Sequence, residues 1–195
     1  ANKKFYAKEG YIIVAMSWII LSLIGSMPFY LSGYIPSYID ALFESVSGFT
    51  TTGASILSNV ENLSNGMLFW RIFTHWIGGM GVLVFIIAVL PLTGGENMHI
   101  MRAETPGPSV GKLVPKLRKA AIYLYAIYFS LTVFQTILLI INKMPIFDAV
   151  CIAMGTAGTG GFGIKNSSMA SYGVTINVIV TVFMLLFGVN FSFYF

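Results

Sequence analysis

Two short segments of this 195-residue chain combine threonine and glycine in a pattern suited to binding a metal cation. Backbone carbonyls along an extended strand can replace the water shell of a small cation. Glycine permits dihedral angles that turn successive carbonyls toward one axis, and threonine adds a hydroxyl and favours extended backbone. We therefore predict two ion-binding segments. Their residues are Thr50, Thr51, Thr52 and Gly53 in the first, and Gly158, Thr159, Gly160 and Gly161 in the second.

A helix-length stretch precedes each segment and must position it. These stretches cover about 37–49 and about 146–157, and each follows a proline and contains an Asp-Ala pair. The carboxyl end of such a helix would aim the negative end of its dipole at a cation. We expect the two aspartates, Asp40 and Asp148, to satisfy backbone amides at the helix N-termini.

The similarity between the two stretches predicts an internal repeat. A gapless alignment of the aspartates sets Thr51 opposite Thr159 and Gly53 opposite Gly161. Gly160 stays an alternative to Gly161, because the Thr-Gly-Gly sequence leaves the register open by one residue.

The composition places these elements in a membrane. Of the residues, 56% are hydrophobic and only 9% are charged, whereas soluble domains carry about 25% charged residues. Crossing a bilayer takes roughly 20 apolar residues. Four segments meet that length, at 11–31, 67–92, 120–142 and 173–195. Between the spans of each pair, a short helix followed by glycine-rich backbone indicates a re-entrant half-helix, since non-helical backbone is tolerated there only when it lines water or is buried in protein.

We therefore predict an all-α membrane protein built from two parallel repeats. Each repeat contains a transmembrane helix, a re-entrant half-helix with a filter loop, and a second transmembrane helix. The first repeat covers 1–92, a cytoplasmic basic loop covers 93–119, and the second repeat covers 120–195. Two such loops enclose only half of an ion, so we expect this chain to be half of a four-repeat pore, completed either within a larger polypeptide or by an oligomer.

The distribution of positive charge predicts the orientation. Cytoplasmic loops carry an excess of lysine and arginine. Eight basic residues fall on the side of the N-terminus and the basic loop, against Arg71, Lys143 and Lys165 on the other side. Both termini of this segment are therefore expected in the cytoplasm. The net charge of +4 could suggest a nucleic-acid partner, but the basic residues are placed as the positive-inside rule requires, so we expect none. The eight are Lys3, Lys4, Lys8, Arg102, Lys112, Lys116, Arg118 and Lys119.

Four motifs in order, SGFTTTGAS, HWIGGMGV, RAETPGP and TGGFG, resemble those of the Trk-type potassium uptake subunits, the TrkH/TrkG-like branch of the Trk/Ktr/HKT superfamily. The resemblance runs essentially from end to end. It implies potassium uptake across the cytoplasmic (inner) membrane through one pore made of four helix–pore-loop–helix units, of which this chain would be the first two. The filter glycines carry over onto Gly53 and Gly161, with Gly160 as the alternative.

The resemblance also implies partners. These are the remaining two pore repeats of the full-length protein, a second copy of that protein in a homodimer, a cytosolic nucleotide-binding regulatory subunit, and membrane lipids. The branch usually carries two further N-terminal spans, which this chain lacks. Potassium would be the transported ion, and no cofactor and no transition-metal site are expected.

Other functions fit the residues less well. The letters GTGGFG match a dinucleotide fingerprint, but the following residues are a polar loop and a membrane span. An intramembrane protease would need an H-E-x-x-H, paired-aspartate or reactive-serine arrangement, so we expect no enzyme. A water channel would show paired Asn-Pro-Ala tips, which are absent. A sodium-permeable or other monovalent-cation pore of the same superfamily remains the alternative.

Polar and small residues inside the spans predict further contacts. We hypothesise that Glu44 and Arg71, at similar depth, pair and brace the first half-helix. His75 lacks partners at metal-ligand spacing and is expected to make one hydrogen bond. The glycine cluster at 78–81 favours close helix packing, with a hinge or pore lining as alternatives.

Overall fold

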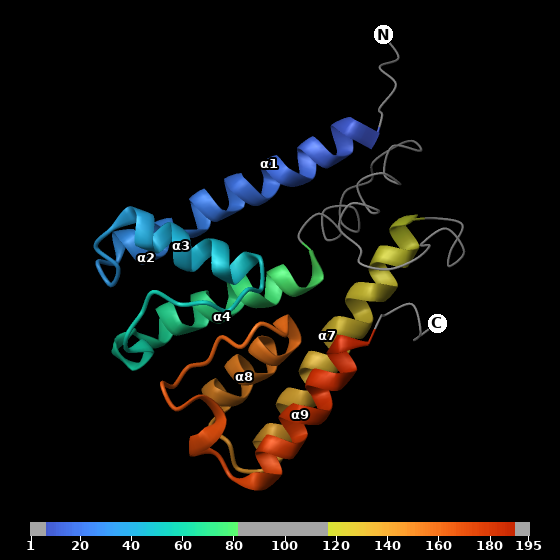
Figure 1. Cartoon of the computed structure of the whole chain (residues 1–195). Helices are drawn as coiled ribbons and strands as arrows, with labels where there is room; N and C mark the ends of the chain where they lie inside the picture. The colour runs from blue at the N-terminus through green and yellow to red at the C-terminus, as the bar shows by residue number, and fades with distance from the viewer. Residues whose placement is uncertain (1–6, 82–116, 190–195) are drawn as a thin grey trace.

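The computed structural model describes residues 7–81 and 117–189, and every regular element within them is helical. In the first half, five elements follow one another (Figure 1). They are α1 (Ala7–Gly25), α2 (Met27–Leu31), α3 (Tyr38–Phe49), the 3-10 helix η1 (Val60–Asn62) and α4 (Asn65–Met80).

The second half repeats much of this order. A long helix, a shorter helix, a 3-10 turn and a last helix follow in sequence. They are α7 (Leu117–Ile141), α8 (Ile146–Gly158), η3 (Ser168–Ser171) and α9 (Val174–Gly188). Helices α3 and α8 thus occupy corresponding places in the two halves, and each is followed by one of the threonine- and glycine-rich segments.

Short polar residues start two of the helices. The hydroxyl of Ser37 accepts a hydrogen bond from the backbone amide of Asp40, and the hydroxyl of Ser64 accepts one from Met67. Such caps satisfy amides that have no partner inside the helix. The start of α8 has Pro145 in the capping position, which cannot cap with its side chain.

The expectation that the aspartates serve as caps is therefore wrong. At α3 the serine three residues earlier already binds the amide of Asp40. At α8 the carboxylate of Asp148 accepts a hydrogen bond of 2.8 Å from the Tyr172 hydroxyl and lies 3.8 Å from the Lys165 ammonium group. Asp148 therefore binds the chain that follows the second segment, because two donors from that chain reach its carboxylate.

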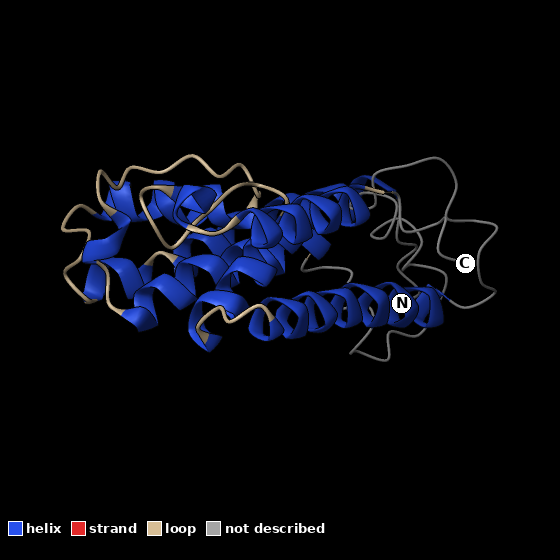
Figure 2. Ribbon diagram, turned by 90° about the horizontal axis from the view of Figure 1, so that it is seen from below, coloured by secondary structure: helices blue, strands red, loops and turns tan. Residues whose placement is uncertain are grey.

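Helix α4 joins the two halves. It packs against α3 on one side and α8 on the other, while α7 and α9 pack on α8 from the far side (Figure 1). The helices α1 and α7 begin, and α4 and α9 end, at one end of the molecule. Most of the connecting loops gather toward the opposite end (Figure 2). Both halves therefore run in the same direction.

The main core of buried side chains lies between the halves rather than inside either one. Val60, Leu63, Leu68 and Ile72 of the first half pack against four residues of the second, and the shared residues are all buried. The four are Cys151, Met154, Phe162 and Ile164. Burial of apolar surface contributes about 25 cal/mol per Å². This interface therefore fixes α8 and the loop after it against α4.

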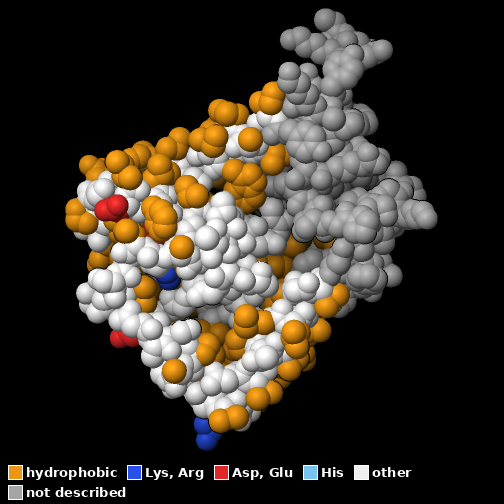
Figure 3. Space-filling view, in the orientation of Figure 1, with side chains coloured by type: hydrophobic (Ala, Val, Ile, Leu, Met, Phe, Trp, Pro, Cys, Tyr) orange, Lys and Arg blue, Asp and Glu red, His pale blue; other side chains and the backbone are white. Residues whose placement is uncertain are grey.

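The outer surface is strongly apolar. Two stretches, Ile12–Leu31 and Ala121–Ile141, are long and apolar enough to cross a membrane by length and composition. Hydrophobic side chains gather along the edge over α1 and along the edge over α7 and α9 (Figure 3). Contiguous exposed apolar surface of this extent marks contact with lipid or protein. Members on α1 include Ile12, Met16, Ile19, Ile20 and Ile24, and members on α9 include Val174, Val178, Val182 and Leu185.

The other two predicted spans are described only in part. Helix α4 has 16 residues and α9 has 15. The continuations at 82–92 and 190–195, and most of the predicted loop at 93–119, lie outside the described residues.

Candidate ion-binding site

The structure brings the two threonine- and glycine-rich segments into contact. A methyl group built on Gly53 would overlap the backbone carbonyl of Gly160. One built on Gly160 would overlap the backbone carbonyl of Thr51. Two main-chain oxygens, one from each segment, therefore lie at the contact between the loops.

The two segments have similar backbone φ angles at two of their aligned positions. Thr51 and Thr159 have φ angles of 54° and 55°, and Gly53 and Gly161 have φ angles of 74° and 93°. These are the pairs that the alignment of the two aspartates sets opposite each other. Gly160 is not among the residues with positive φ. The φ angles therefore favour Gly161 over Gly160 as the residue equivalent to Gly53.

Two threonines in this conformation indicate strain at the site. For a β-branched residue a positive φ is a genuine outlier. Such residues persist only where the surrounding structure enforces them, and they concentrate at functional sites. Thr51 and Thr159 each follow a helix, since Thr159 caps the end of α8 and Thr51 comes one residue after the cap of α3. The strain lies where each chain turns from the helix into its loop.

Relieving the backbone strain at Thr159 should increase the free energy of unfolding. Replacing Thr159 by asparagine should raise the free energy of unfolding by about 1 kcal/mol, because asparagine tolerates the left-handed region better than threonine does. The Thr159 side chain is exposed. Thr175→Asn, an exposed position of ordinary helical conformation in α9, is the control and should change stability by less than about 0.5 kcal/mol. Denaturant unfolding of the detergent-solubilised protein measures both variants. Equal effects at the two positions would contradict strain at Thr159.

Local hydrogen bonds hold the first loop against α3. The Ser47 hydroxyl donates to the carbonyl of Ala54, and the Ser47 carbonyl accepts from the amide of Thr52 at 3.0 Å. The Thr50 hydroxyl donates to the carbonyl of Val46 at 2.7 Å and lies 2.8 Å from the Thr52 hydroxyl. In this structure the side chains of these two threonines therefore bind neighbouring groups, and their backbone carbonyls remain the candidate ligands.

The hypothesis that Glu44 and Arg71 pair is confirmed. The Arg71 guanidinium donates through Nε to the Glu44 carboxylate, and the side chains are 3% and 0% exposed. The same carboxylate accepts from the Ser55 hydroxyl at 3.0 Å and from the amide of Ile56 at 3.0 Å. The pair therefore anchors α3, α4 and the end of the first loop to one another.

Arg71 also reaches the second loop, which the sequence did not predict. Its Nη1 donates to the carbonyl of Gly163 at 2.8 Å, and its guanidinium carbon lies 3.6 Å from the centre of the Phe162 ring. One buried ion pair thus links both loops. No sequence signal marked this contact, because the partners are a main-chain carbonyl and an aromatic face.

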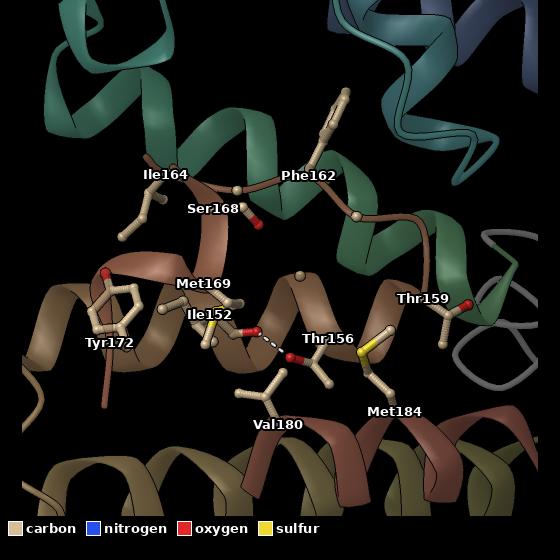
Figure 4. Close-up of a pocket in the computed structure, with 13 residues that line it drawn as sticks. Ile152, Thr156, Thr159, Phe162, Ile164, Ser168, Met169, Tyr172, Val180 and Met184 are labelled. Carbon is tan, nitrogen blue, oxygen red and sulfur yellow. Dashed lines mark hydrogen bonds between the residues drawn. The ribbon is translucent and has the colours of Figure 1, made fainter. Parts of the chain in front are cut away.

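The corresponding place in the second half is a cavity of about 160 Å³ (Figure 4). Ile152 corresponds to Glu44 in the alignment of the aspartates, and Val180 is the seventh residue of α9, as Arg71 is of α4. Both line this cavity, together with Thr159 and Gly161 of the second segment. At this place the first loop therefore binds the Glu44 carboxylate, whereas the second loop borders a cavity lined mostly by apolar residues.

The other residues singled out by sequence fall close to the loops. A methyl group on Gly78 would overlap the backbone carbonyl of Phe49, so close packing explains that glycine. His75 is fully buried, and neither ring nitrogen has a hydrogen-bond partner among the described residues. The expected single hydrogen bond of His75 is therefore not formed, because its ring faces glycine backbone and the Phe162 ring, 4.8 Å away.

A second polar cluster lies where the second loop returns to α8. Besides its contact with Asp148, the Lys165 ammonium group stands 4.3 Å above the ring of Tyr172. Partial burial raises the pKa of Tyr172, and the hydrogen bond to Asp148 adds to the rise. The phenol thus stays protonated and keeps donating to the carboxylate. Within the described ranges, no group of three or more metal-ligating side chains is present.

Comparisons with known proteins identify the family. The family model TrkH, described as a cation transport protein, matches residues 1–195. The chain is 38% identical to the Trk system potassium uptake protein TrkH of Salmonella typhimurium, with 97% of this chain and 40% of that protein covered. It is 35% identical to the Trk system potassium uptake protein TrkG of Escherichia coli, with 95% and 39% covered.

A solved structure has the same fold. The crystal structure of the potassium transporter TrkH from Vibrio parahaemolyticus superposes with a TM-score of 0.80 at 33% identity, over 100% of this chain and 39% of that one. The chain therefore spans about 40% of the length of the relatives it matches.

Proposed function

Because this chain belongs to the TrkH family of cation transport proteins, we propose that it forms two of the four repeats of a pore that takes up potassium. The first repeat would contain α1 to α4, and the second α7 to α9. The proposed ligands are backbone carbonyls of residues 50–53 and 158–161. Potassium is the transported substrate, and no covalent step is involved.

The proposed mechanism is coordination and release. A cation entering the filter loses water, and carbonyl oxygens replace the lost contacts. Helices α3 and α8 end at the two segments, so the negative ends of their dipoles lie where a cation would bind. A cation is thereby favoured over an anion. The ion then leaves toward the cytoplasm.

One observation carries the proposal. Two segments far apart in sequence touch, and they adopt the same unusual sequence of backbone conformations at paired positions. A left-handed residue commonly ends a helix, and Lys143 does so after α7, but glycine is the usual choice. A filter would explain why a strained threonine stands at both equivalent places, because each loop must direct its carbonyls in the same way toward a shared ion.

The full-length protein supplies what this chain does not. Two loops surround only half of an ion, so the other two repeats would complete the ring. We further propose a homodimer of the full-length subunit in the inner membrane, and a cytosolic nucleotide-binding regulatory subunit on the side of the chain termini. The exposed apolar faces of α1 and α9 support contact with lipid and with the remaining repeats.

Replacing Gly161 by serine tests the proposal. Gly161 has positive φ and open space where a side chain would stand, so serine acts there through the backbone alone. Gly173 also has open space, but its φ is −66°, and Gly173→Ser is the matched control. In liposomes containing the full-length protein, we expect the potassium-to-sodium flux ratio to fall by about 10-fold for Gly161→Ser. The ratio should stay unchanged for Gly173→Ser.

Two results would contradict this function. If the wild-type protein carried no monovalent cation, the transport proposal would fail. If Gly161→Ser kept the wild-type ratio in a folded protein, the assignment of the second segment to the filter would fail. A wild-type protein that passes sodium as readily as potassium would support the sodium-permeable alternative.

A further inference from the structure

His75 is a buried polar side chain that the proposed mechanism does not use. Its exposed fraction is 0%, and both ring nitrogens lack a hydrogen-bond partner among the described residues. A neutral imidazole carries one donor and one acceptor, and leaving them unpaired in a protein interior is unfavourable. The side chain therefore needs an explanation beyond filling space.

The ring lies directly behind the second candidate filter segment. A methyl group on Gly158 would overlap its Cδ2 atom, and one on Gly160 would overlap its Cε1 and Nε2 atoms. The imidazole thus leaves no room for a side chain at either glycine, and nearby backbone carbonyls, of His75 at Gly158 and of Thr51 at Gly160, add to this restriction.

The first segment meets the ring at the same place. The methyl group that would overlap Nε2 of His75 would also overlap the carbonyl oxygen of Thr51. The imidazole nitrogen and a carbonyl of the first loop therefore converge beside Gly160 of the second loop. Both atoms stand 2.2 Å from the position of that one methyl group, so the distance between them is at most twice this value.

The surrounding charges favour a neutral ring. One turn earlier on α4 stands the Arg71 guanidinium, which is paired with Glu44 from α3. A protonated imidazole would add a positive charge beside this arginine and beside the cation path. The neutral form keeps one N–H available as a donor to a carbonyl.

We propose that His75 is a positioning residue for ion selectivity: its Nε2–H orients the Thr51 carbonyl and sets the spacing between the two loops. This proposal rests on the filter proposed above. Oriented carbonyls cannot close around a smaller ion such as sodium as readily as free ones. The imidazole thus acts through the carbonyl, without touching the ion.

Two substitutions separate this role from space filling. His75→Leu keeps a similar volume but has no donor, whereas His75→Gln keeps an N–H at a similar reach. Both variants of the full-length protein are reconstituted in liposomes, and potassium and sodium fluxes are measured beside thermal unfolding. We expect the potassium-to-sodium ratio to fall about 10-fold in His75→Leu and to stay within about 3-fold of wild type in His75→Gln.

The measurements distinguish a failure of the positioning role of His75 from a failure of the proposed filter. A wild-type protein without potassium flux would refute the filter. With wild-type flux present, a folded His75→Leu variant with unchanged selectivity would refute the positioning role alone. So would a His75→Gln variant that is as unselective as His75→Leu while unfolding at the wild-type temperature. Selectivity lost in His75→Leu and kept in His75→Gln would support the proposal.

Discussion

Replacing Gly53 by serine should abolish the potassium selectivity proposed above and lower the free energy of unfolding by about 2–3 kcal/mol. Two effects add at this position. The φ angle of 74° is strained for any residue with a side chain, and a Cβ would overlap the backbone carbonyl of Gly160. A backbone atom cannot move aside as a flexible side chain can, so the loops would have to separate.

Gly33 provides the control for this prediction. Its φ is 77°, nearly the same as that of Gly53, but nothing stands within 4 Å of where its side chain would be, and it lies in the turn between α2 and α3. Gly33→Ser should therefore cost only the backbone strain, about 1 kcal/mol, and leave selectivity unchanged. Cation flux in liposomes and unfolding in detergent measure the two variants side by side. Equal losses of stability with unchanged selectivity in both would show that the contact between the loops is unimportant.

Removing Arg71 should be the most destabilising single change in the described part of the chain. Breaking a buried pair leaves an uncompensated charge and costs about 3–5 kcal/mol. Arg71→Met would leave the Glu44 carboxylate in a site that is 0% exposed, and it would also release the carbonyl of Gly163 in the second loop. Both loops should therefore loosen together, and selectivity should fall with stability.

A double variant separates the effect of an unpaired buried charge from the effect of losing the Arg71 side chain. Glu44→Gln combined with Arg71→Met removes both charges, while the glutamine oxygen can still accept from the amide of Ile56. We expect the double variant to recover at least about 2 kcal/mol relative to Arg71→Met alone. Lys165→Met, a change at a lysine that is 35% exposed, is the control and should alter stability by less than about 1 kcal/mol. A double variant no more stable than Arg71→Met would refute a coupled buried pair.

The sequence predicts the repeat because composition and register are local properties. Proline, Asp-Ala and the threonine-glycine run recur at matching distances, and the structure has helices α3 and α8 at those places. The pairing of Glu44 with Arg71 was also predictable, since a charge inside an apolar segment needs a partner.

The contacts between the loops were not predictable in the same way. Gly158 and Gly160 were predicted as filter residues from their sequence alone, whereas the structure also places the His75 ring and backbone carbonyls where their side chains would stand. The capping role given to the aspartates was wrong for a similar reason. Which donor reaches a carboxylate depends on which distant part of the chain folds back beside it. Tyr172 lies beside Asp148 only in the folded protein.

The different supports of the two loops have a mechanical consequence. Arg71 contacts both loops, but the Glu44 carboxylate binds only the first, and the second borders a cavity lined by Ile152 and Val180. In the proposed four-repeat filter, the two loops would then differ in stiffness. Thermal fluctuations would be larger in the second loop. A pore assembled from such unequal repeats would lack true fourfold symmetry even where its backbone repeats. Its second loop would deform first, beside the cavity.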